Sequence, residues 1–277
     1  MPGGLDHVIH AVRDLEAAAE LYRRLGFTVG ARNRHAWGTH NHLIQFPGFF
    51  IELLTVAELS ALFGTFNRIF LKDQEGLSFL ILESEDVVTD AARFRSAGIG
   101  VSDAMRFERE GKRPDGSAVK VAFSLAFARD AKAPATGFAV CQQHFPEHFW
   151  NPAFQQHANT TSNIEAAVLV AENPGEHHAF LSAFAGGRDM SATSSGITAS
   201  TPRGEISVMD AAGFHRQFGT ESPNIARGAR LAALRFCVRD RAALGAALKA
   251  GGIAARADAS KTIVGPEIAL GATLVFD

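Results

Sequence analysis

The chain has 277 residues, with 27 Lys and Arg against 29 Asp and Glu, a net charge of -2, and 47% hydrophobic residues. At about 150 residues per domain this is one large domain or two ordinary ones, and the composition excludes a disordered chain. The balanced charge gives no reason to expect a nucleic acid or a membrane surface as a partner.

The sequence shows no sign of a disulfide framework, a membrane span or a secretory signal. The two cysteines, Cys141 and Cys237, are too few for a disulfide framework or a thiolate metal cluster. No apolar run is long enough to span a bilayer. Residues 1–7 lack the basic start and apolar core of a secretory signal, so we expect a cytoplasmic protein.

A local pattern recurs along the chain. Residues 5–12 form an apolar, β-type run, Asp14 provides a helix start, and Gly26 ends the helix. The Asp-to-Gly spacing of 12 residues occurs three times: Asp14 to Gly26, Asp86 to Gly98, and Asp240 to Gly252. A weaker copy has its strand at 164–171 and its helix start at Asn173-Pro174. Internal repetition of this kind defines the fold.

Each copy continues into further β-type sequence, so the predicted unit is β-α-β-β-β. The four units span 4–58, 75–150, 161–212 and 229–277, and 213–228 is expected to be a linker. The predicted fold class is α+β, with the units paired into two curved mixed sheets that have concave cups and helices outside. We expect two domains, 1–150 with a cup for a small molecule and 151–277 as a second pair of units.

Glu52 is the most informative residue of the first cup. It lies inside the otherwise apolar run 49–54, and alternation places it on one strand face with Phe50. A buried, isolated carboxylate is costly, so it is expected to be protonated, ion-paired or bound to a metal. Pairing with an arginine remains the structural alternative.

Two histidines occupy related places. His144 ends the corresponding strand of the second unit, and His7 lies on the first strand, where it points away from His10. The position of the second unit that matches His7 is Phe79, which cannot bind a metal.

His7, Glu52 and His144 together form a 2-His-1-carboxylate set with an open side. Such a set binds a divalent ion, and Fe, Mn, Zn, Ni or Co would each be acceptable. Gln142 is expected beside it as an outer or weak fourth ligand.

Several motifs of the chain are found together in one known family. They are Leu5-Asp-His7-Val, Asp14-Leu15-Glu16-Ala17, Leu25-Gly26-Phe27-Thr28-Val29, His35-x-x-Gly38-Thr39-x-Asn41-x-Leu43-Ile44, Phe50-Ile-Glu52-Leu53-Leu54, Gln143-His144-x-Pro146-Glu147 with Trp150, and Gln156-His157-x-Asn159. On these motifs the chain resembles the vicinal oxygen chelate superfamily, which includes glyoxalase I, extradiol dioxygenases and bleomycin-resistance proteins. Within it, the chain is similar to the glyoxalase-like domain family.

The resemblance implies a metal at His7, Glu52 and His144, and a cup wall shaped by Gly38, Thr39 and Asn41 with His35 nearby. Phe50 and Gln142 complete the expected substrate pocket. Glu147 is a candidate proton-shuttling carboxylate. The second half lacks the triad: Glu165, Val208 and Ala233 stand at the equivalent positions. Residues 106–113 are predicted to form a solvated hairpin of mixed charge.

Two functions of different classes follow. The first is a divalent-metal-dependent enzyme acting on a small oxygen-chelating substrate, by glyoxalase-type isomerisation or lyase chemistry, ring-cleaving dioxygenation, or hydrolysis. The second is a metal-free small-molecule binding or resistance-type protein. In both cases we expect a monomer or homodimer with a small-molecule partner and no nucleic-acid or membrane partner.

Overall fold

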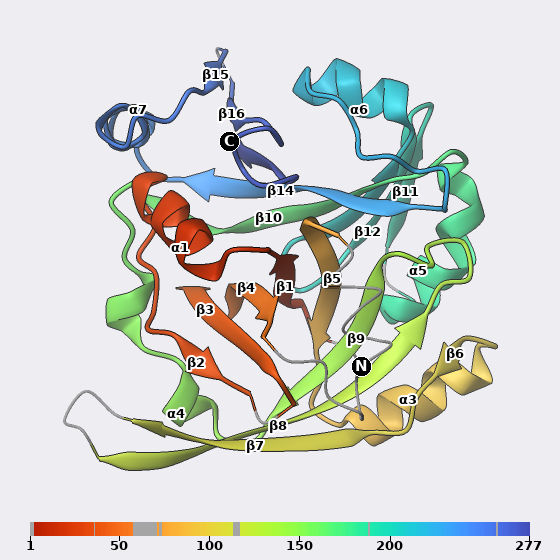
Figure 1. Cartoon of the computed structure of the whole chain (residues 1–277). Coiled ribbons are helices and arrows are strands. Elements are labelled where there is room, and N and C mark those ends of the chain that lie inside the picture. The colour runs from red at the N-terminus through yellow and green to blue at the C-terminus, as the bar shows by residue number, and fades with distance from the viewer. Residues whose placement is uncertain are drawn as a thin grey trace.

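Two mixed β-sheets, one from each half of the chain, make up the computed structural model (Figure 1). It describes residues 3–35, 37–57, 71, 74–112, 117–187, 189–258 and 260–277. Residues 58 and 113, which end two predicted segments, lie outside these ranges. No helix in the described part of the chain is long and apolar enough to cross a membrane.

The first sheet, sheet A, has the strand order β2-β3-β4-β1-β5-β9-β8-β6, and β7 pairs with β8. Its elements are β1 (Leu5–Ala11), α1 (Leu15–Arg24), β2 (Asn33–Arg34), β3 (Thr39–Phe46), β4 (Phe49–Val56), β5 (Gly76–Glu83), α3 (Val87–Ser96), β6 (Gly100–Val101), β7 (Met105–Lys112), β8 (Ala118–Arg129) and β9 (Gly137–Gln143). A connection then carries α4 (Pro146–Phe149) and a 3-10 turn (Pro152–Gln155). The two units meet where β1 pairs antiparallel with β5, and each unit adds its last strand in parallel, β4 beside β1 and β9 beside β5.

The second sheet, sheet B, repeats this plan in the order β11-β12-β13-β10-β14-β17-β16-β15. Its elements are β10 (Thr161–Val170), a 3-10 turn (Pro174–His177), α5 (His178–Phe184), β11 (Met190–Thr193), β12 (Gly196–Ser200), β13 (Glu205–Met209), α6 (Ala211–Phe218), β14 (Arg230–Val238), α7 (Arg241–Ala250), β15 (Arg256–Ala257), β16 (Thr262–Val264) and β17 (Thr273–Phe276). The predicted α+β fold of paired units in two curved mixed sheets is confirmed.

The repeated aspartates cap helices as predicted. The side chains of Asp14, Asp86 and Asp240 accept hydrogen bonds from backbone amides in the first turns of α1, α3 and α7. These bonds satisfy amides that have no partner inside the helix. The 12-residue spacing therefore measures one helix, from the aspartate that caps its start to the glycine that follows its end.

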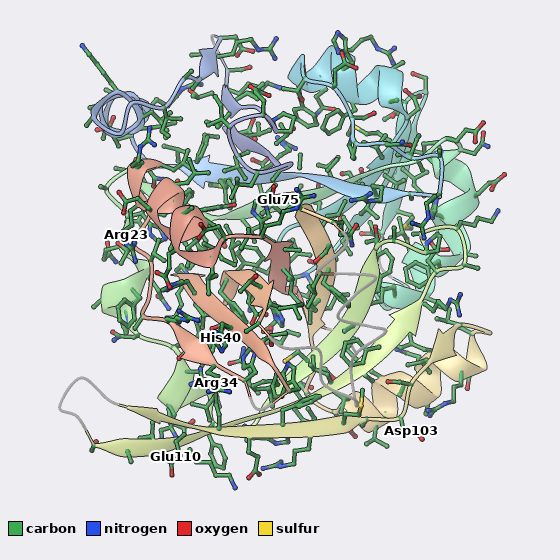
Figure 2. The ribbon with its side chains drawn as sticks, viewed as in Figure 1. Arg23, Arg34, His40, Glu75, Asp103 and Glu110 are labelled. Atoms are coloured by element: carbon green, nitrogen blue, oxygen red, sulfur yellow. The ribbon has the colours of Figure 1, made fainter. Side chains whose placement is uncertain are left out.

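The two sheets share one apolar core. Helices α1, α3, α5 and α7 each contribute buried side chains to it, as do strands of both sheets. Aromatic contacts cross between the halves, with ring centroids 5.7 Å apart for Phe46 and Phe236 and 4.7 Å apart for Phe138 and Phe180. Charged side chains such as Arg23, Asp103 and Glu110 lie at the periphery (Figure 2).

Helix α6 was not expected. The sequence predicted a linker over 213–228, but residues 211–218 form a helix that starts at Asp210 and ends at Gly219 in the left-handed conformation. Its Phe214 and Phe218 pack against Val168 and other side chains on the face of sheet B away from the shared core. The cup of the second half is thus filled by the chain itself.

Candidate functional site

A cavity of about 110 Å³ lies on the face of sheet A away from the shared core. This is more space than a single water molecule needs. Most of the lining is aliphatic or aromatic, and the polar side chains gather among it. They are His7, His35, Thr39, Asn41, Glu52, Arg109, Cys141 and Gln143. An apolar hollow with a few convergent polar groups is the usual form of a small-molecule site.

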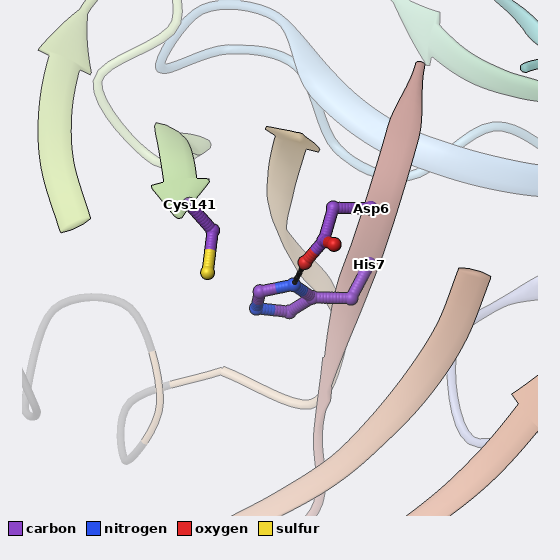
Figure 3. Close-up of side chains that lie close together, drawn as sticks. All are labelled: Asp6, His7 and Cys141. Atoms are coloured by element: carbon purple, nitrogen blue, oxygen red, sulfur yellow. Dashed lines mark hydrogen bonds and ion pairs between the residues drawn. The ribbon is translucent and has the colours of Figure 1, made fainter. Parts of the chain in front are cut away.

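His7 is held in one orientation by Asp6 (Figure 3). The Nδ1 of His7 donates to Oδ2 of Asp6 at 2.5 Å, and the His7 ring stacks on Phe50 with centroids 4.3 Å apart. Because the carboxylate only accepts, the proton of the neutral ring is on Nδ1. Nε2 is then left with a lone pair and has no hydrogen-bond partner among the described residues. This is the arrangement in which a histidine serves as a metal ligand or a base.

An irregularity of the strand makes this pair possible. The register between β1 and β5 shifts between Leu5 and His7, so Asp6 is an extra residue at a bulge. Simple alternation would send Asp6 and His7 to opposite faces. The bulge instead brings both side chains together, whereas His10 lies on the helix side, where it bonds Tyr22. The opposite directions predicted for His7 and His10 are observed.

Gln143 secures Asp6 from the next unit. Its Nε2 donates to Oδ1 of Asp6 at 3.0 Å, which fixes the amide orientation because the carboxylate needs a donor. The Oε1 of Gln143 is buried without a hydrogen-bond partner. Such an orphaned acceptor is uncommon in a folded protein and is typical of a place where a ligand binds.

Glu52 lines the cavity from β4, the strand beside β1. It is 8% exposed, and it accepts a hydrogen bond of 2.5 Å from Nδ2 of Asn41, while Nε2 of His35 lies 4.0 Å from Oε1. His35 is in turn bonded to Thr39 at 2.8 Å. Burial lowers the pKa of His35, opposed by the nearby charge of Glu52. Among the described residues, no arginine lies within ion-pair distance of Glu52.

Cys141 completes the group around Asp6. A carboxylate oxygen of Asp6, a ring nitrogen of His7 and Sγ of Cys141 lie within 4.8 Å of one another. Burial, together with the charges of Asp6 and Glu52, raises the pKa of the Cys141 thiol well above its ordinary value. The thiol therefore stays protonated and is not an activated nucleophile.

The predicted ligand His144 does not reach the cavity. Its Nε2 is bonded to Oγ of Ser124 at 2.8 Å, and Gln142 donates to the backbone oxygen of Glu85, so both lie outside the cavity lining. The reason is the register of β9. Phe138 and Val140 fill the shared core, which leaves Ala139, Cys141 and Gln143 to face the cavity. The three predicted metal ligands are therefore not assembled.

Of the other predicted site residues, four line the cavity and one does not. His35, Thr39, Asn41 and Phe50 all line the cavity. Glu147 does not: its side chain is 65% exposed in the first turn of α4, near His148.

Arg109 is a cavity residue that the sequence did not reveal. The segment 106–113 was predicted to be a solvated hairpin, and Arg106 and Glu108 do form an exposed ion pair. Arg109 and Phe107 instead line the cavity from β7. The sequence did contain one signal: Phe107 is apolar and lies two positions before Arg109. Because side chains alternate along a strand, Phe107 and Arg109 share one face, and an apolar residue on that face indicates burial.

In the second half, the position proposed to match His7 carries an ion pair. Glu165 accepts from Nη2 of Arg235 at 2.9 Å, and Arg235 also pairs with Asp277. The carboxylate of Glu165 is half-buried and serves in a structural ion pair. Together with the aromatic side chains of α6, it leaves the described part of sheet B with an occupied cup.

Comparison with known proteins identifies the family. The sequence profile of the glyoxalase-like domain matches residues 5–184. The chain belongs to the glyoxalase-like domain family. The match runs past residue 150 into the second half, and the predicted membership of the glyoxalase-like domain family is confirmed. No curated protein matches the sequence.

Two solved structures share the fold of this glyoxalase-like protein. A hypothetical protein from Staphylococcus aureus has a TM-score of 0.70 at 14% identity, covering 99% of this chain and 98% of that one. A mutant of 4-hydroxymandelate synthase from Streptomyces coelicolor has a TM-score of 0.58 at 13% identity, covering 93% and 77%. A methylmalonyl-CoA epimerase from Streptomyces coelicolor matches 52% of this chain and 99% of its own, at 20% identity and a TM-score of 0.38.

The divalent ion that this superfamily implies can be tested against the cavity. The group of Asp6, His7 and Cys141 is closed by its own hydrogen bonds, with Asp6 already accepting from His7 and Gln143. The groups with unused electron pairs are Nε2 of His7, the Glu52 carboxylate and the orphaned Oε1 of Gln143. An imidazole, a carboxylate and an amide oxygen fit a divalent ion in chemical type.

Proposed function

We propose that this protein is an enzyme that transforms a small, mostly apolar molecule with neighbouring oxygen atoms in the cavity of sheet A. His7, Glu52 and Gln143 would hold a divalent metal ion there. The observation that carries the proposal is the orphaned Oε1 of Gln143, buried beside an imidazole that Asp6 holds in its ligand tautomer. The expected cytoplasmic location and monomeric or homodimeric state stay predictions.

The chain's own residues have separable tasks. Asp6 fixes the ring of His7 and the amide of Gln143, so both groups are oriented before substrate arrives. Asn41 occupies one oxygen of Glu52, which leaves the other to hold or accept a proton from the substrate. The apolar lining excludes water and strengthens each of these interactions. A bound divalent ion would polarise a substrate oxygen as a Lewis acid.

Metal content of purified variants distinguishes the ligand set with Gln143 from the one with His144. We expect near-stoichiometric Fe, Mn, Co, Ni or Zn in protein purified without chelator or a nickel column, and loss of most of it in His7→Gln and Glu52→Gln. Gln143→Leu should weaken metal retention about 10- to 100-fold. His144→Gln is the matched control and should retain metal, because its side chain bonds Ser124 outside the cavity. Loss of metal in His144→Gln alone would contradict this ligand set.

The reaction class needs a separate assay. Deuterium exchange into enolisable carbonyl compounds tests isomerase or lyase chemistry, and oxygen consumption with catechols tests ring cleavage. Either activity should fall at least 100-fold in Glu52→Gln, about 2.7 kcal/mol of transition-state stabilisation.

A metal-free binding protein is the second candidate. Its support is the lining itself, in which apolar side chains, Phe79 and other aromatic rings among them, outnumber the polar groups. If the wild-type protein holds no metal after incubation with Fe(II), Mn(II) and Zn(II), the enzyme proposal fails as stated. Ligand binding without turnover would then be the remaining function.

A further inference from the structure

Arg109 is a cation in the apolar wall of the cavity. The residue is half-buried, and burial lowers the pKa of its guanidinium. The one hydrogen bond described for the side chain runs from Nη1 to the backbone oxygen of Glu110 at 3.4 Å. No carboxylate of the described residues lies within ion-pair distance. Withdrawing a charge from water without an ion pair is costly, so such a residue is usually kept for a partner.

The carboxylates near Arg109 are committed elsewhere. Glu108 pairs with Arg106 at 2.9 Å and with Lys120 at 2.6 Å. Glu52 shares the cavity and its charge raises the pKa of Arg109, but it bonds Asn41. The five guanidinium donors are thus almost unused.

Aromatic rings line the cavity together with this cation. Trp37 and Phe107 have ring centroids 4.7 Å apart, and Phe107 and Phe123 have centroids 5.7 Å apart. Trp37, Arg109 and Phe123 line both the inner cavity and an outer hollow of about 300 Å³, which Arg34 and Glu108 also line. Arg109 therefore lies at the junction of an apolar chamber and a more polar entrance.

We propose that Arg109 is the anchor for a carboxylate of the substrate, whose apolar, preferably aromatic, body lies among these rings. A guanidinium recognises a carboxylate with two parallel hydrogen bonds. In a cavity that also contains the acidic Glu52, one cation balances a single negative charge better than a dianionic phosphate. This inference rests on the proposed function only in placing the substrate in this cavity, and it does not require a metal.

The test uses two probes of the same size and body that differ only in the head group, an anionic carboxylate in 3-phenylpropanoate and a neutral amide in 3-phenylpropanamide. Binding is measured by calorimetry on the full-length protein after chelator treatment, so a missing metal does not affect the result. We expect the acid to bind at least tenfold more tightly than the amide. In Arg109→Gln this preference should vanish, and in Arg109→Lys it should persist in part. Arg106→Gln, on the outer face of the same strand, is the matched control and should keep it.

Thermal unfolding separates recognition from a structural role. Because Arg109 has no ion pair to lose, Arg109→Gln should unfold at the same temperature as the wild type or higher. Equal binding of acid and amide, no binding of the acid at millimolar concentration, or equal loss in Arg106→Gln would each overturn the proposal. A wild-type protein that holds no metal after incubation with Fe(II), Mn(II) and Zn(II), but still prefers the acid, would refute the metal site while leaving this inference intact.

Discussion

Gly137 leaves room for the ring of Phe79 because glycine has no Cβ. A Cβ at this position would lie 2.0 Å from Cε1 of Phe79, which faces the cavity from the neighbouring strand. Gly137→Ala should therefore push the ring into the cavity, lower the free energy of unfolding by about 1–3 kcal/mol, and weaken ligand binding. Chemical unfolding and calorimetry measure the two effects.

A second glycine provides the control for that substitution. Gly245 lies inside α7 with no atom within 4 Å of its would-be Cβ. Gly245→Ala should stabilise the protein by about 0.5–1 kcal/mol, because alanine is the better helix former. Similar effects of the two substitutions would contradict the packing argument.

His10 should make stability depend on pH. Burial lowers its pKa to about 4, while its neighbours Tyr22 and Leu270 bond both ring nitrogens. Between pH 6.5 and 4 the unfolded chain binds a proton at His10 that the native protein does not, so stability falls as pH decreases. The expected contribution is about 2 kcal/mol less stability at pH 5 than at pH 7.

Unfolding of His10→Gln at both pH values checks this. The variant should be less stable at pH 7 but should lose less on going to pH 5. His157, whose pKa is also lowered to about 4 by burial, accounts for a remaining pH dependence. An unchanged pH dependence in His10→Gln would rule out His10 as its source.

At the scale of elements, α6 distinguishes the two cups. Phe214 and Phe218 are fully buried in the cup of sheet B, whereas the cup of sheet A retains a cavity. Phe214→Ala should cost about 3–5 kcal/mol of stability, because it leaves a hole in a packed cluster. Val88→Ala, at a position 64% exposed, is the control and should change stability by less than about 0.5 kcal/mol.

The strands show where sequence patterns stop being informative. Capped helices could be predicted from Asp14, Asp86 and Asp240, because a cap depends on neighbours a few residues away. The face of β9 could not, because both of its faces are buried and the run 137–141 has no polar alternation. Because the facing of β9 could not be predicted, the sequence placed His144 in the cavity, whereas the structure places Gln143 there.

At the scale of the whole molecule, the two halves are parts of one core. Arg203 of the second half donates to the backbone oxygen of Leu5 and pairs with Glu83, and its Cβ occupies the space beside Gly4. Aromatic rings from both halves complete the apolar interior. The domains predicted at 1–150 and 151–277 are therefore joined by a large apolar interface.

Expression of residues 1–150 alone tests this dependence. The fragment should aggregate or bind a hydrophobic dye, because the face that packs on the second half would be exposed. Co-expression with 151–277 should restore a soluble complex. A monomeric fragment 1–150 with a sharp thermal transition would show that the halves are independent.

The sequence by itself determined the repeat, the helix caps, the fold class and the family, because these depend on local spacing and on motifs that survive in order. It also singled out His7 and Glu52, since polar residues in apolar strands stand out in any register. Only the tertiary structure decided which groups meet. The bulge at Asp6, the register of β9 and the inward turn of Arg109 depend on packing between strands that are distant in sequence. That packing leaves His144 outside the cavity lining and puts Gln143 and Arg109 in it.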